Sequence, residues 1–139
     1  MSLHFELVTP ERTLFQEEAL QVTLPTTLGE ITILPEHQDI VATLVTGIAH
    51  LKRKDGEEDI AVSGGFIEVK GNLVRVLADT AERGEELDIQ AIEQAKKRAE
   101  DIMKATDRRD DNAFAAAAAA LERELARYRV ANKRRGMRK

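Results

Sequence analysis

The sequence holds 139 residues, of which 42% are hydrophobic, so it can form one ordinary domain or two small ones with a hydrophobic core. It contains no cysteine, which excludes disulfides, thiolate metal ligands and cysteine nucleophiles and favours a cytoplasmic location. No stretch approaches the roughly 20 apolar residues of a membrane span, and the N-terminus shows no targeting signal. The formal net charge of −4 divides into −7 over residues 1–84 and +3 over residues 85–139, which indicates two electrostatically different parts.

The first part of the chain has the pattern of short β-strands. In residues 3–9, Leu3, Phe5 and Leu7 alternate with other side chains, as in a strand with one buried face. Similar segments recur every 8–12 residues with no helical pattern between them, which predicts an antiparallel β-sandwich or a barrel. The other expected strands cover residues 12–16, 19–24, 29–34, 48–53, 59–62, 66–70 and 73–77.

The strand expected over residues 29–34 lies between two prolines, Pro25 and Pro35. Because proline inside a sheet is confined to edges, strand starts and bulges, we expect this strand to be entered and left through rigid turns. Polar side chains near its two ends are then held on stiff backbone, which suits a docking surface. The candidate docking residues are Glu30 and His37. The alternative is that both are exposed residues without a partner.

Glycines mark two hairpin turns and one irregular position. Asp55-Gly56 is a strong hairpin signal, and Gly71-Asn72 supplies a two-residue turn whose positions tolerate positive φ. Ser63-Gly64-Gly65 matches neither the G-x-S-x-G nucleophile elbow nor the G-x-x-x-x-G-K-[ST] phosphate loop. We interpret this tripeptide as a bulge or a tight entry into a strand.

Two helices are predicted after residue 84. Asp88 is the expected N-cap of the first helix, and residues 106–112 favour a break. The second helix is expected from about residue 113 to about residue 132. Its alanine run, residues 115–120, favours the helix but offers little area to bury, so the helix can form and detach easily. The short break predicts an antiparallel hairpin lying loosely against the sandwich. The apolar stripe of the first helix is Ile89, Ile92, Ala95, Ala99, Ile102 and Met103, and that of the second is Phe114, Ala117 or Ala118, Leu121, Leu125 and Tyr128.

Enzyme signatures are absent from the sequence. The three histidines, His4, His37 and His50, do not have the H-E-x-x-H spacing of a zinc site and have no cysteine partners. We can name no nucleophile paired with a general base. The sequence therefore predicts no catalytic residue and no metal ligand.

The C-terminal segment carries a basic cluster. Residues 122–139 hold eight cations against two acids, a local charge of +6. Three interpretations compete: a solvated helix end, a nucleic-acid patch, or a surface that meets an acidic protein segment. Nucleic acid is disfavoured because the rest of the chain is acidic and the nearby aromatic residue, Tyr128, belongs to the apolar stripe. The candidate basic face consists of Arg123, Arg127, Arg129, Lys133, Arg134 and Arg135.

Three segments of the chain form a recognisable set: residues 24–37 (LPTTLGEITILPEH), 63–69 (SGGFIEV) and 76–83 (VLADTAER). In their order and separations they resemble the epsilon-subunit family of rotary proton-translocating ATP synthases of the bacterial type. The resemblance implies an α+β protein: a β-sandwich domain over residues 1–84, then a regulatory antiparallel helical hairpin over residues 85–139. It also implies a non-catalytic central-stalk subunit, peripheral to the cytoplasmic face of the cell membrane.

The same resemblance implies partners and roles. The sandwich would bind the gamma subunit and the rotor c-ring, with Glu30 and His37 at the positions that rest on the ring, and so couple proton flow to ATP synthesis. The hairpin would be stowed on the sandwich or extended toward the alpha/beta catalytic head. There the basic face would meet an acidic beta segment and inhibit ATP hydrolysis. The alternatives are a stand-alone β-sandwich ligand-binding module with an oligomerising helical tail, and a small hydrolase.

Some members of this family bind ATP on the stowed hairpin through an Ile/Leu-Asp-x-x-Arg-Ala motif. Leu87 and Asp88 match its start, but Ala91 stands at the arginine position and Ile92 at the alanine position. The loss of a guanidinium that could pair with phosphate argues against ATP as a cofactor. The residues that could still form a weak ATP site are Glu82, Asp88, Arg98, Arg123 and Arg127.

Overall fold

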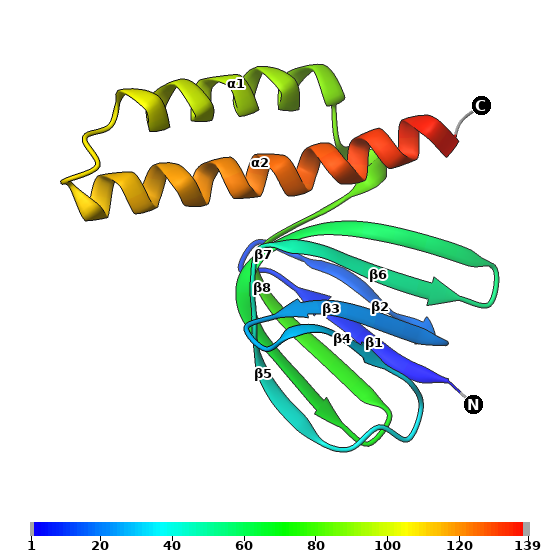
Figure 1. Cartoon of the computed structure of the whole chain (residues 1–139). Helices are drawn as coiled ribbons and strands as arrows, with labels where there is room; N and C mark the ends of the chain where they lie inside the picture. Colours follow the sequence, from blue (N-terminus) through cyan, green and yellow to red (C-terminus); the bar gives the residue numbers. More distant parts are fainter. Residues whose placement is uncertain (1, 138–139) are drawn as a thin grey trace.

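The computed structural model describes residues 2–137, and the side chains of residues 2–133. In this part of the chain, eight strands precede a short 3-10 helix and two α-helices, so the α+β class is confirmed (Figure 1). The strands are β1 (Leu3–Val8), β2 (Thr13–Ala19), β3 (Gln21–Thr26), β4 (Gly29–Ile33), β5 (Ile40–Leu44), β6 (Gly47–Arg53), β7 (Gly56–Lys70) and β8 (Leu73–Arg83). The helices are η1 (Gly84–Glu86), α1 (Ile89–Ala105) and α2 (Asp111–Met137).

The strands form a β-sandwich whose hydrogen-bonded order is β2-β1-β8-β7-β5-β3-β4, with β6 pairing with β3 and β7. All of these pairs are antiparallel except β1 with β8, which is parallel. The first half of β7 pairs with β6 and the second half with β5, and β8 runs beside most of its length. The long strands β7 and β8 therefore connect the two layers of the sandwich (Figure 1).

One strand replaces two that the sequence predicted. Residues 59–62 and 66–70 belong to the same strand, β7, because Ser63-Gly64-Gly65 continues it without a shift in its pairing with β8. Gly64 and Gly65 have φ angles of 65° and 126°, which residues other than glycine rarely adopt. The two glycines thus let the strand bend instead of ending it.

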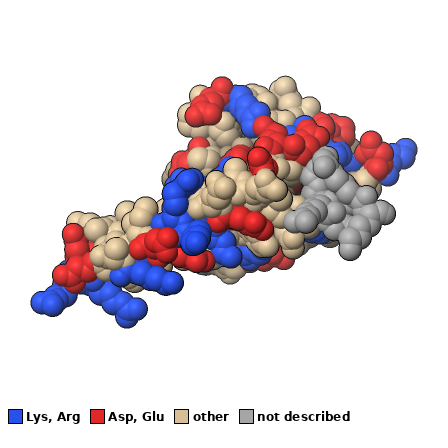
Figure 2. Space-filling view, turned by 90° about the horizontal axis from the view of Figure 1, so that it is seen from above, with Lys and Arg blue, Asp and Glu red and all other residues tan. Residues whose placement is uncertain are grey.

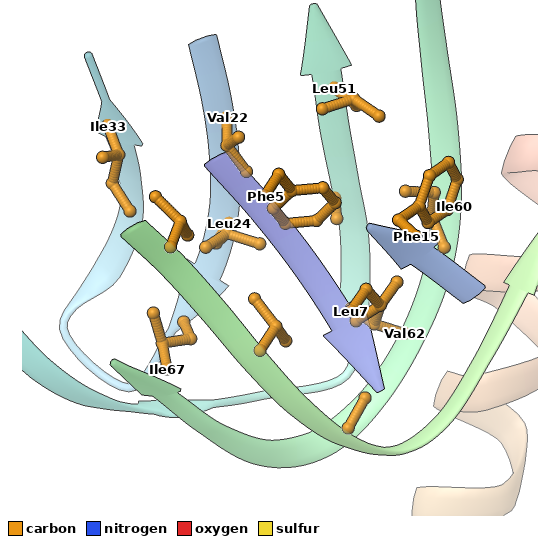
Figure 3. Packing of buried hydrophobic residues seen from close by; sticks show 14 of the residues in the cluster. Phe5, Leu7, Phe15, Val22, Leu24, Ile33, Leu51, Ile60, Val62 and Ile67 are labelled. Atoms are coloured by element: carbon orange, nitrogen blue, oxygen red, sulfur yellow. The ribbon is translucent and has the colours of Figure 1, made fainter. Parts of the chain in front are cut away.

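The core is the one that the alternating pattern predicted. Leu3, Phe5 and Leu7 are each 0% exposed, and the rings of Phe5 and Phe15 lie 5.9 Å apart between centroids. Figure 3 shows Phe5, Leu7 and Phe15 among other side chains from several strands that point into the space between the sheets. The alternation alone was sufficient for β1 because this strand buries only one of its faces.

The prolines flank β4 differently from our prediction. Pro25 lies inside β3, near its end, and the chain turns afterwards at residues 27–28. Proline has no N–H to contribute, but its carbonyl still accepts a hydrogen bond from the Val45 N–H at 3.0 Å. Pro35 lies in the turn that leaves β4, two residues after the strand ends at Ile33, as predicted.

The helical hairpin was predicted with small errors. The Asp88 carboxylate caps α1 by accepting from the N–H groups of Gln90 and Ala91, at 3.0 and 3.4 Å. Ile102 was wrongly placed on the buried stripe, since it is 59% exposed. Adjacent helical residues point about 100° apart, so only one of Ile102 and Met103 can face α2, and it is Met103 that is partly buried.

Helix α2 lies between α1 and the sandwich (Figure 1). It extends to Met137, beyond the predicted end near residue 132, because residues 113–135 contain no glycine or proline and Gly136 stands only one residue before its end. Ala126, Val130 and Ala131 are buried, although none belongs to the predicted stripe. That stripe described only the side of the helix that meets α1. Among residues 2–137, no helix is both long and apolar enough to cross a membrane.

Candidate functional site

The junction between α2 and the sandwich brings together charged residues that are distant in sequence. Arg127 Nε lies 2.8 Å from Glu82 Oε1, and a terminal nitrogen of the same guanidinium donates to Glu82 Oε2 at 3.0 Å. The other terminal nitrogen donates to both oxygens of Glu124, at 3.0 and 2.9 Å. Arg127 is therefore held by two carboxylates, one from β8 and one from its own helix.

A second junction lies closer to the C-terminal end of α2. Lys133 Nζ is 2.8 Å from Asp59 Oδ2, and His50 Nδ1 is 2.5 Å from Asp59 Oδ1. The Asp59 side chain is only 11% exposed. It stands directly opposite His50 in the β6–β7 ladder, so its position is fixed by strand pairing.

The predicted basic face is thus divided. Two of its members, Arg127 and Lys133, pair with acidic residues of the sandwich. Arg123 and Arg129 are exposed. The side chains of Arg134 and Arg135 lie outside the described residues. Figure 2 shows Lys and Arg interleaved with Asp and Glu over the helical side of the molecule, so the described surface there has no large patch of one sign.

The candidate ATP-site residues are occupied by other contacts or are exposed. Glu82 and Arg127 lie together, but their charges are used in an ion pair with each other. Asp88 uses its carboxylate to cap α1, while Arg98 and Arg123 are exposed. For the side chains that the structure describes, no cluster of three or more His, Cys, Asp or Glu could hold a metal ion.

The two candidate docking residues lie in different places. Glu30 is exposed on β4 and lines a hollow of about 250 Å³ that also includes His50, Asp59 and Lys133. His37 is partly buried in the loop between β4 and β5, where its Nδ1 lies 2.7 Å from the Gln38 carbonyl oxygen. The structure therefore does not join Glu30 and His37 into one site.

The loop that carries His37 is fixed to the β7–β8 turn. The Glu36 N–H donates to Asn72 Oδ1 at 2.8 Å, and the Gly71 N–H donates to Asp39 Oδ1 at 3.0 Å. Glu36 also has a positive φ of 68°. These contacts give His37 the stiff backbone that the prolines led us to expect, through partners that the sequence did not reveal.

An apolar surface is exposed on the outer face of the sheet formed by β5, β7 and β8. Val41, Phe66 and Leu77 are 77%, 61% and 50% exposed. Phe66 stands directly opposite Leu77 in the β7–β8 ladder, and Val41 lies on the neighbouring strand β5. The sequence does not reveal this patch, because the face of the sheet on which a residue lies cannot be assigned without the register. Exposed clusters of large apolar side chains commonly mark protein interfaces.

The short helix η1 is anchored to the sandwich by Glu86. Its carboxylate accepts from the Arg83 N–H at 3.0 Å and from the Arg12 guanidinium at 2.6 Å. Burial pushes the pKa of Glu86 upward, but these two donors outweigh it and hold the pKa below its ordinary value of 4.5. The fold therefore stabilises the ionised form of Glu86.

We expect this anchor to weaken in acid. A carboxyl group with a lowered pKa in the folded state contributes stability that is complete above its unfolded pKa and is lost as the pH falls through the folded one. The free energy of unfolding should consequently drop less steeply between about pH 5 and pH 3 in Glu86→Gln than in the unchanged chain. Urea unfolding at several pH values measures this. Glu11→Gln, at an exposed position, is the control, and equal slopes in all three proteins would contradict the prediction.

Comparison with known proteins agrees with this architecture. Residues 2–84 match the family model of the ATP synthase delta/epsilon chain β-sandwich domain. An ATP synthase epsilon chain from Moorella thermoacetica is 42% identical over 131 residues, 94% of this chain and 96% of the relative. One from Herpetosiphon aurantiacus is 40% identical over 135 residues, 97% of this chain and 98% of the relative.

The fold is also found in a solved assembly. A chain of the Euglena gracilis mitochondrial ATP synthase, in a structure of its OSCP, F1 and c-ring parts, matches 87% of this chain with a TM-score of 0.75. The match covers 76% of that chain, and at 24% identity it shows likeness of fold. Fold and family model together define the class of ATP synthase delta/epsilon β-sandwich proteins. Within this class, the chain belongs to the epsilon-chain family of ATP synthase.

Proposed function

We propose that this chain is a non-catalytic subunit of the central stalk of a proton-translocating ATP synthase. It couples proton flow to ATP synthesis by binding the gamma subunit and the rotor c-ring, as a peripheral subunit at the cytoplasmic face of the cell membrane. The observation that carries the proposal is the family match over nearly the whole chain, to relatives that are themselves named as ATP synthase subunits.

The sandwich, residues 1–84, is the anchoring part in this proposal. The patch of Val41, Phe66 and Leu77 offers an apolar contact for the gamma subunit, since large side chains that remain exposed gain free energy when a partner covers them. Glu30 and His37 would contact polar loops of the c-ring from two separate positions. The fixed loop around His37 supports this role because a stiff loop loses little entropy on docking.

The hairpin, residues 85–139, is the regulatory part. Its basic face would bind an acidic segment of the beta subunits when the hairpin extends, and would thereby inhibit ATP hydrolysis. This role is supported by the small apolar area that holds the hairpin on the sandwich, since the buried residues of α2 are alanines and one valine. In the stowed state, Arg127 already pairs with two carboxylates and Ala91 supplies no guanidinium, so the proposed switch works without bound ATP.

Binding to the assembly tests the anchoring role. We expect Phe66→Glu to weaken association with the gamma subunit at least roughly tenfold, because a charge in a desolvated apolar contact costs more than about 1.4 kcal/mol. The measurement is co-purification and titration with the other central-stalk subunits of the same ATP synthase. Leu28→Glu makes the same change at an 85% exposed residue outside the patch and is the matched control. If the unchanged chain did not co-purify, a stand-alone ligand-binding module would be favoured; equal binding by both variants would reject the patch.

A further inference from the structure

We propose that Asp59 and Glu82 of the sandwich act as an internal substitute for the acidic partner of α2. While the hairpin is stowed, they occupy Lys133 and Arg127, two cations of the basic face, and so mask that face. The inference rests on the proposed function of the hairpin and names the residues that regulate it.

Asp59 is a carboxylate placed to bind a cation from outside the sandwich. Strand pairing sets it opposite His50, which takes Oδ1 at 2.5 Å and leaves Oδ2 directed elsewhere. Among the side chains that the structure describes, no aligned hydrogen-bond donor reaches Oδ2, but the Lys133 ammonium lies 2.8 Å from it. Because the Asp59 side chain is only 11% exposed, an unpaired charge there would be costly. Lys133 thus compensates a charge that strand pairing has already buried.

Glu82 of β8 provides a second ionic contact, with Arg127, which lies about one and two-thirds turns before Lys133 on α2. Arg127 Nε lies 2.8 Å from Glu82 Oε1, and the two side chains are 25% and 31% exposed. Two ion pairs separated by six residues hold α2 at two points along its length, which fixes its direction on the sandwich as well as its position.

The apolar contact between these points is small. Ala126 and Val130 are buried on the same helical face as Lys133, at intervals of four and three residues, and Lys133 identifies this face as the one against β7. Ala131 is buried as well, but two alanines and a valine bury little apolar area. The ion pairs therefore contribute a larger share of the free energy of docking than they would beside leucines or phenylalanines. The stowed state should therefore respond to changes in charge.

The masking follows from the pairing itself. Arg127 and Lys133 cannot contact the sandwich acids and an acidic partner at the same time, so the stowed and extended states compete for the same cations. A change that weakens the internal ion pairs by a given factor raises the ratio of extended to stowed hairpin by the same factor, and only the extended hairpin is available to the partner.

Distances between two labels in the isolated full chain test the proposal. The sequence lacks cysteine, so spin labels can be placed uniquely at exposed positions in the β6–β7 turn and the α1–α2 break, by Asp55→Cys and Arg109→Cys. We expect Asp59→Asn combined with Glu82→Gln to raise the fraction of undocked hairpin roughly tenfold, and added salt to raise it in the unchanged chain. Glu68→Gln, an exposed acid on the same strand but outside the hollow lined by Asp59 and Lys133, should leave the fraction unchanged. The exchange Asp59→Lys with Lys133→Asp should restore docking relative to Asp59→Lys alone.

Distance distributions that are the same in the unchanged chain and the Asn/Gln variant would overturn the proposal, as would failure of the charge exchange to restore docking. The rate of ATP hydrolysis by the assembled complex distinguishes this proposal from the proposed inhibitory function of the hairpin. Lower hydrolysis with the Asn/Gln variant would support both the internal ion pairs and the inhibitory function. An undocked hairpin with unchanged hydrolysis would support the internal ion pairs and reject the inhibitory role.

Discussion

Removal of residues 88–139 is expected to leave a folded sandwich and to raise ATP hydrolysis by the assembled ATP synthase roughly threefold to tenfold, as when a mostly inhibited population is released. The sandwich should survive because every described member of its main hydrophobic cluster lies between Leu3 and Ala81. The cut also retains Glu86 and its contact with Arg12. The loss of the hairpin therefore removes the basic face without opening the core.

The measurement is the rate of ATP hydrolysis by complexes reconstituted with the full or the shortened chain, with circular dichroism to confirm the β-structure. A full-length variant in which Arg123 and Arg129 are both changed to Gln serves as the comparison, because it removes two exposed cations of the basic face and leaves the ion pairs of Arg127 and Lys133 with the sandwich intact. It should also relieve inhibition, by a smaller factor. Unchanged or reduced hydrolysis after the truncation would reject the inhibitory role of the hairpin.

Gly65→Ala is expected to destabilise the sandwich by about 3 kcal/mol or more, close to the limit of what a domain of this size tolerates. A Cβ at Gly65 would fall on the Leu77 carbonyl oxygen and against Ala78 Cα, both of which are backbone atoms of β8. Neither can move without breaking the β7–β8 ladder, and the φ of 126° is itself unfavourable for alanine.

Gly29→Ala separates the two contributions. Gly29 has a similar φ of 106°, but a Cβ there meets nothing within 4 Å. We expect this variant to lose only about 1 kcal/mol, the cost of the backbone conformation alone. Urea denaturation with the linear extrapolation gives both values. Equal losses in the two variants would show that close approach of β7 and β8 does not require glycine.

Much of the local structure could be predicted from short segments of sequence. The burial of Leu3, Phe5 and Leu7 followed from alternation, the start of α1 from Asp88, and one hairpin turn from Gly71-Asn72. Each of these depends on interactions between residues a few positions apart, so no knowledge of the rest of the chain was needed. The family resemblance, carried by three short motifs, was confirmed for the same reason: it required only the order and spacing of residues.

The tertiary structure decided which of these residues can act together. Glu82 and Arg127 are 45 residues apart in the chain, and no local pattern indicates that they form an ion pair. Phe66 and Leu77 become one exposed surface only through the register of β7 and β8. By itself, the sequence determined most of the strands, the two helices and the presence of a basic tail, because these depend on local periodicity and composition. It did not predict β5, and it divided β7 into two strands. The faces of the sheets and the partners of the cations depend on how distant segments pack, and packing is a property of the whole fold.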